Sequence, residues 1–268
     1  MKEAFQKEQV KRRMKRGVFL LPSLFTIANL LCGVYAIVAV YNDEYIKAAI
    51  AILVAVFLDG FDGAIARLTN SQSEFGIQLD SLADLVSFGV APAILAYVWA
   101  IKPYGQIAWF FEAIVPTALF VSCAAFRLAR FNIQTTNLDK RYFIGLPSPA
   151  AAITIASFVL LILGSPAGDG LSRQATSIMT VLMVYILAFF MVSRLRYRSL
   201  KGIEIKRRQP FALLIGLTLL LLLIASQPSV VLFAGSVTYV ASGPIRLAFK
   251  RKGALEVSRE AVTGERRV

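Results

Sequence analysis

Long apolar runs separated by short polar segments dominate the chain, and each run has roughly the 20 residues that a helix needs to cross a bilayer. We predict eight spanning helices from these runs, at about 18–41, 46–67, 80–101, 107–130, 145–164, 174–193, 210–226 and 228–248. Only Gln227 and Pro228 separate the last two, which form either two spans or one long kinked helix. The pattern predicts an all-α, polytopic membrane helix bundle.

Lysine and arginine are concentrated in every second connection between the runs, whereas the connection after the first run contains Asp43 and Glu44. Because cytoplasmic loops carry the excess of cations, we expect both termini to face the cytoplasm. The expected divisions are a basic juxtamembrane segment 1–17, a six-helix transmembrane core 18–193, a basic cytoplasmic loop 194–209, two additional transmembrane helices 210–248 and a polar cytoplasmic tail 249–268.

Composition narrows the chemistry that the chain can support. Hydrophobic residues make up 57% of it, and its net charge is +13. The cations lie between apolar runs, where they orient the chain and meet anionic headgroups, so no nucleic-acid partner is expected. Histidine is absent, which excludes imidazole bases and ligands, and two cysteines within apolar runs are too few for a zinc cluster. Carboxylates must therefore supply any metal ligands.

Four aspartates have the spacing of such a site. Asp59 and Asp62 are three residues apart, and Asp80 and Asp84 are four apart, so each pair shares one face of a helix. Charged groups at membrane depth indicate function by default, and divalent cations are the simplest way to hold several carboxylates together. Oxygen-only ligation favours Mg²⁺ or Mn²⁺. We predict a two-ion site of the kind that assists phosphoryl displacement.

Small residues accompany these acids. Gly63 and Ala66 would let a nucleotide approach the ions closely, while Arg67 would bind a phosphate. Plain helix packing is the alternative for the glycines taken alone.

The complete pattern D-x2-D-G-x2-A-R-x8-G-x3-D-x3-D runs from Asp59 to Asp84 and resembles the signature of the CDP-alcohol phosphotransferase family. The resemblance implies a six-helix core over 18–193, a homodimer, and two Mg²⁺ or Mn²⁺ ions held by the four aspartates. It implies that Asp84 is also the general base. The expected contacts with CDP-diacylglycerol are Thr26, Asn29, Asp62, Gly63, Ala66, Arg67, Ser73 and Gly76.

Segments outside the signature narrow the resemblance to the membrane-embedded, serine-using subfamily; they are 26–33, 127–132, 145–152, 193–201 and 242–244. Serine adds a carboxylate to an anionic site, so extra cations are expected near the acceptor. The expected serine contacts are Arg127, Arg130, Asn132 and Ser148. The alternative is that both arginines anchor a helix end and that Ser148 caps a helix.

The expected reaction is phosphatidyl transfer from CDP-diacylglycerol to L-serine, which gives phosphatidylserine and CMP, at a prokaryotic cell membrane. Three alternatives stay open: an acceptor such as glycerol-3-phosphate or inositol phosphate, an archaeal CDP-lipid donor, and an ion-coupled transporter. Transporters place their acids at the bilayer midplane within repeated halves, and this chain has no visible repeat.

Overall fold

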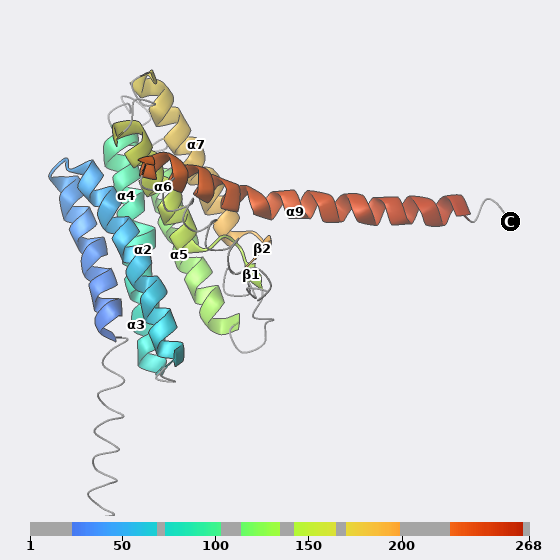
Figure 1. Cartoon of the computed structure of the whole chain (residues 1–268), viewed down its shortest axis with the longest axis horizontal. Helices are drawn as coiled ribbons and strands as arrows, with labels where there is room; N and C mark the ends of the chain where they lie inside the picture. The colour runs from blue at the N-terminus through green and yellow to red at the C-terminus, as the bar shows by residue number, and fades with distance from the viewer. Residues whose placement is uncertain are drawn as a thin grey trace, which may run out of the picture.

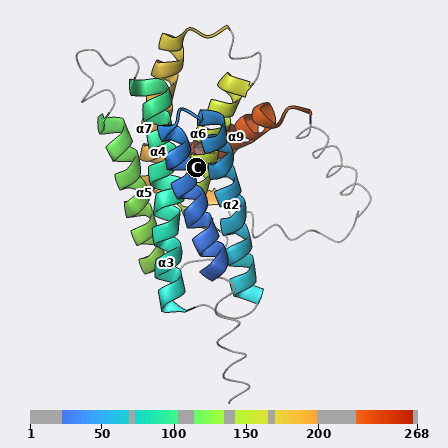
Figure 2. The ribbon, with the colours of Figure 1, turned by 90° about the vertical axis from the view of Figure 1, so that its left-hand side faces the viewer.

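The computed structural model describes residues 23–68, 73–102, 114–134, 142–164, 170–198 and 226–264. They form a bundle of long helices with one short two-stranded ribbon (Figure 1). The helix Ser23–Tyr41 and helix α2 (Tyr45–Leu68) lie side by side in both views (Figures 1 and 2). Asp43 forms the turn between them with φ 59°, a left-handed conformation that aspartate tolerates.

A continuous helical segment of 28 residues, Glu74–Ile101, follows. It comprises α3 (Glu74–Asp84), a π-helical turn Leu85–Val90, α4 (Ala91–Ala96) and a second π-helical turn Tyr97–Ile101. Pro92 has no N–H to continue the α-helical pattern, and Ala91 N–H donates to Val86 O five residues earlier. This first π-helical turn begins at Leu85, directly after Asp84.

The remaining helices are α5 (Val115–Gln134), α6 (Ser148–Gly164), α7 (Arg173–Val192) and α9 (Pro228–Gly264). Strand β1 (Tyr142–Ile144) pairs with the antiparallel strand β2 (Arg196–Arg198). Because β1 precedes α6 and β2 follows α7, this ribbon holds the start of α6 against the end of α7.

Small residues let the helices approach closely. Fully buried alanines from three helices share one core, among them Ala36, Ala48 and Ala156. A Cβ at Gly33 would lie 2.8 Å from the Cα of Ser87, so the helix Ser23–Tyr41 can contact the first π-helical turn only through glycine. Large apolar side chains such as Phe57, exposed to 65%, cover the outside, as expected of a protein surrounded by lipid.

Four helices among the described residues are long and apolar enough to cross a membrane: Ser23–Tyr41, Glu74–Ile101, Arg173–Val192 and Pro228–Leu247. The all-α polytopic membrane architecture is therefore confirmed. Helix Ser148–Gly164 is apolar but shorter. The segment predicted as a seventh helix, 210–226, lies outside the described residues except at its end.

Several helix boundaries differ from the predicted ones. The predicted third helix begins earlier, at Glu74, because the Ser73 side chain caps it by accepting a hydrogen bond from Gly76 N at 3.0 Å. Helix α5 continues to Gln134, and α9 continues to Gly264.

Candidate active site

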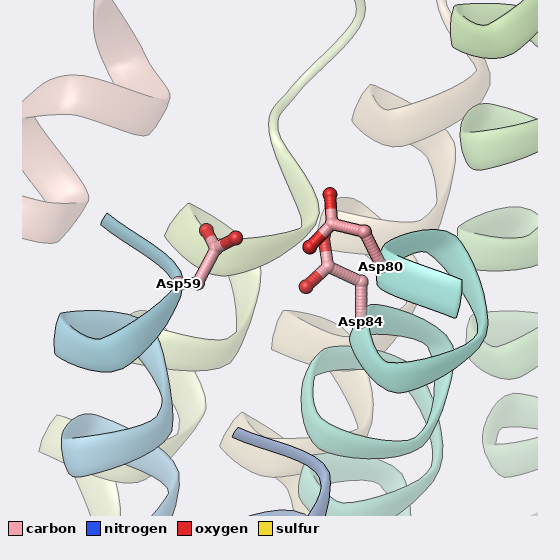
Figure 3. Close-up of side chains that lie close together, drawn as sticks. All are labelled: Asp59, Asp80 and Asp84. Carbon is pink, nitrogen blue, oxygen red and sulfur yellow. The ribbon is translucent and has the colours of Figure 1, made fainter. Parts of the chain in front are cut away.

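Three of the four predicted aspartates converge on one point. Asp59 projects from α2, whereas Asp80 and Asp84 project from successive turns of α3 toward it (Figure 3). One carboxylate oxygen from each lies within 4.8 Å of the others. The four-residue spacing of Asp80 and Asp84 thus has the effect predicted from the sequence. Asp62 lies three residues along α2 from Asp59, in a part of the helix whose side chains are outside the described residues.

The donor set fits a hard divalent cation. Three carboxylates this close repel one another, and Asp84 is only 8% exposed, so water screens it poorly. Oxygen-ligated ions such as Mg²⁺ remove the repulsion and match the ligand chemistry. We call Asp59, Asp80 and Asp84 the aspartate triad.

Asn29 orients the buried member of the triad. It is fully buried, and its Nδ2 donates to Asp84 Oδ1 at 3.1 Å, while its main-chain carbonyl accepts a hydrogen bond from Ser87 Oγ at 2.9 Å. Its side-chain Oδ1 has no hydrogen-bond partner among the described residues. Buried polar atoms are normally satisfied, so this acceptor fits a site that receives a ligand. The sequence predicted a lipid contact for Asn29 but not its bond to Asp84.

Arg127 is the cation beside the triad. Its Nη1 donates to Ser148 Oγ at 2.6 Å, and Ser148 is fully buried at the start of α6. The guanidinium interacts electrostatically with Asp84 and Asp59. Arg127 and Ser148, two of the residues predicted to bind serine, therefore contact each other next to Asp84, the predicted general base.

Arg130 is engaged with the main chain. Its Nη2 donates to Ile144 O at 2.7 Å and Met191 O at 3.2 Å, and its Nη1 donates to Val192 O at 3.1 Å. The last two carbonyls belong to the final turn of α7, where a cation also opposes the helix dipole. These contacts match the anchoring alternative, and a serine contact by Arg130 stays a prediction.

Gly145 makes room for this arginine. Its φ is 84°, and a Cβ there would lie 2.5 Å from Arg130 Nη2. Only glycine satisfies both the left-handed conformation and the close approach.

The other predicted contacts lie on the helix Ser23–Tyr41, on α2, at the start of α3 and on α5. Asn132 Nδ2 donates to Ser81 Oγ at 2.9 Å and so ties α5 to the part of α3 that carries Asp80 and Asp84. Thr26, on the helix Ser23–Tyr41, is 4% exposed. Ser73 and Gly76 form the start of α3. Gly63, Ala66 and Arg67 lie on α2, but their side chains are outside the described residues.

With this geometry established, comparison with known proteins assigns the class. Residues 19–192 match the model of the CDP-alcohol phosphatidyltransferase family. The chain belongs to this family and is a membrane-embedded transferase. Family membership favours an enzyme over the transporter alternative.

Individual relatives are consistent with this class. A Helicobacter pylori protein named CDP-diacylglycerol–serine O-phosphatidyltransferase is 35% identical over 232 residues, covering 87% of this chain and 92% of the relative. A Bacillus subtilis protein of the same name is 38% identical over 151 residues, covering 54% and 81%. An archaetidylserine synthase from Methanothermobacter thermautotrophicus is 34% identical over 184 residues, covering 68% and 71%.

Proposed function

We propose that this enzyme transfers the phosphatidyl group of CDP-diacylglycerol to the hydroxyl of L-serine, giving phosphatidylserine and CMP. The observation that carries the proposal is the position of Arg127 beside the aspartate triad, where one cation can bind an acceptor carboxylate next to a base. The names of the bacterial and archaeal relatives specify different lipid groups, phosphatidyl and archaetidyl, but both names refer to serine.

Two Mg²⁺ or Mn²⁺ ions would be held by Asp59, Asp62, Asp80 and Asp84. When bound, such ions neutralise diphosphate charge and stabilise the leaving group. The triad supports this assignment for three of the four ligands.

The protein residues then supply positioning and proton transfer. Asp84, oriented by Asn29, accepts the serine hydroxyl proton as that oxygen attacks the phosphorus bearing the diacylglycerol. The bond from this phosphorus to the oxygen of CMP breaks, and CMP leaves. Positioning and electrostatics supply most of the acceleration in phosphoryl transfer.

We propose the substrate contacts that the sequence predicted. Contacts with CDP-diacylglycerol come from Thr26, Asn29, Asp62, Gly63, Ala66, Arg67, Ser73 and Gly76. Contacts with serine come from Arg127, Arg130, Asn132 and Ser148. Arg127 is best placed to bind the serine carboxylate, because among the described residues Ser148 accepts from one of its five N–H donors.

We also propose that the active site and both termini face the cytoplasm of a prokaryotic cell and that the enzyme is a homodimer. The distribution of cations supports the orientation, and the family resemblance supports the dimer.

Lipid product analysis tests the reaction. Purified enzyme would be incubated with CDP-diacylglycerol, labelled L-serine and Mg²⁺ or Mn²⁺, with and without chelator. We expect labelled phosphatidylserine and equimolar CMP that depend on the ion. Parallel reactions with glycerol-3-phosphate and inositol phosphate identify the acceptor, and preferential turnover of either one contradicts the serine assignment.

A further inference from the structure

Ser87 lies beyond the sequence signature, which ends at Asp84, and its fully buried side chain belongs to the π-helical turn Leu85–Val90. Serine hydroxyls inside helices commonly bond to a carbonyl of the preceding turn of their own helix, as Ser81 does here. The hydroxyl of Ser87 instead donates to the main-chain carbonyl of Asn29, 58 residues away in the sequence, at 2.9 Å. This bond therefore joins two helices.

The same helical segment holds Asn29 at two points. The main-chain carbonyl of Asn29 accepts the hydrogen bond from Ser87 Oγ, and its side-chain Nδ2 donates to Asp84 Oδ1 at 3.1 Å. Ser87 follows Asp84 by three residues, so the two contacts lie within about one helical turn of each other. A series of contacts thus leads from the Ser87 hydroxyl through Asn29 to the carboxylate of Asp84.

Gly33 lets the two helices approach closely enough for both contacts. It lies about one turn after Asn29 on the helix Ser23–Tyr41. A Cβ at Gly33 would lie 2.8 Å from the Cα of Ser87, which is closer than two carbon atoms pack without strain. The main chain of Ser87 therefore packs directly against Gly33 while its hydroxyl reaches the carbonyl of Asn29. These two contacts set the position of Asn29 relative to Asp84.

We propose that Ser87 is a positioning residue for the general base, because its hydrogen bond to the carbonyl of Asn29 holds the Asn29 amide against the carboxylate of Asp84. Without the Ser87 hydroxyl, the helix Ser23–Tyr41 can shift relative to the π-helical turn, and the amide no longer holds the carboxylate in one orientation. Orientation of the base matters in the transition state more than in substrate binding. This inference rests on the proposed function, in which Asp84 accepts the proton of serine.

The kinetics of Ser87→Ala in the full-length enzyme test this role. The variant loses the hydroxyl but keeps the Cα and Cβ that pack against Gly33. We expect kcat to fall roughly three- to tenfold, in line with the loss of one neutral hydrogen bond, while the KM values for L-serine and CDP-diacylglycerol change by less than about twofold. Ser157→Ala is the matched control, because Ser157 is also fully buried but its hydroxyl donates to carbonyls of its own helix, Ile153 O and Thr154 O. We expect wild-type constants for it.

A double-mutant cycle shows whether Ser87 acts through Asn29. In Asn29→Ala the side chain that connects Ser87 to Asp84 is absent, so adding Ser87→Ala should lower kcat further by less than about 1.5-fold. A serine with a merely structural role would lower kcat by the same factor in both backgrounds. Equal factors in the two backgrounds, or wild-type kcat in Ser87→Ala, would overturn the positioning role.

A second variant keeps the test decisive if Ser87→Ala does not fold. Ser87→Cys retains a side chain of similar shape, but its thiol is only a weak donor, so kcat should again fall while both KM values stay within about twofold. Wild-type kcat in folded Ser87→Cys would contradict the proposal.

The wild-type reaction separates these outcomes from failure of the proposed function. If the wild type makes no phosphatidylserine, the serine assignment fails before any variant is compared. If the wild type turns over serine and the variants at Ser87 match it, only the positioning role of Ser87 fails.

Discussion

Replacing Asn29 with alanine tests how much the orientation of Asp84 contributes to catalysis. The substitution removes the donor that bonds Asp84 Oδ1 at 3.1 Å in a fully buried setting. The hydrogen bond from Ser87 Oγ to the main-chain carbonyl of residue 29 is kept. The helix Ser23–Tyr41 therefore stays in contact with the π-helical turn Leu85–Val90.

The magnitude follows from the charge of the acceptor. A hydrogen bond to a charged group contributes about 1.5–3 kcal/mol. If Asp84 must be held in one orientation to accept the proton, most of this is lost in the transition state. We therefore expect kcat/KM to fall roughly 10- to 100-fold.

The assay is CMP release at saturating CDP-diacylglycerol, with thermal unfolding followed on the same samples. Thr180→Ala is the matched control, because Thr180 is 1% exposed and its hydroxyl donates to Thr176 O, in a contact that does not involve the triad. We expect the Thr180→Ala control to keep wild-type activity. If kcat/KM of Asn29→Ala also lies within about twofold of the wild type, the role of Asn29 is refuted.

Three other predictions concern the site and its support. Arg130→Met removes hydrogen bonds to three carbonyls and should lower the midpoint of thermal unfolding by several degrees; an unchanged midpoint would show that this anchor is dispensable. Gly33→Val places side-chain atoms against the Ser87 main chain and should abolish the monodisperse gel-filtration peak, whereas Gly235→Val, at a position with open space, should not. Chelation should abolish CMP release and added Mn²⁺ should restore it, whereas full activity in chelator would exclude an essential ion.

Contacts within one helix could be predicted from the sequence. Residues four apart share a helix face whatever the tertiary structure, so Asp80 and Asp84 are adjacent as expected. The lengths of the apolar runs likewise indicated the spanning helices, because the thickness of the bilayer sets the length of a spanning segment.

Contacts between distant segments could not be predicted in this way. The bond between Asn29 and Asp84 spans 55 residues and depends on the close approach that Gly33 allows. Arg130 reaches the end of α7 across separations of 61 and 62 residues. Its third partner, Ile144 O, lies in β1, a strand of three residues that is too short to show an alternating pattern. Helix α9 continues beyond its predicted end because membrane span length limits only the apolar part of a helix.

The central claim is that the aspartate triad binds divalent ions, and Mn²⁺ titration followed by electron paramagnetic resonance tests it most directly. Wild-type enzyme should convert free Mn²⁺ to a bound form, and Asp59→Asn, Asp80→Asn and Asp84→Asn should each weaken or abolish that binding while the protein stays folded. Undiminished Mn²⁺ binding in all three variants would contradict the account.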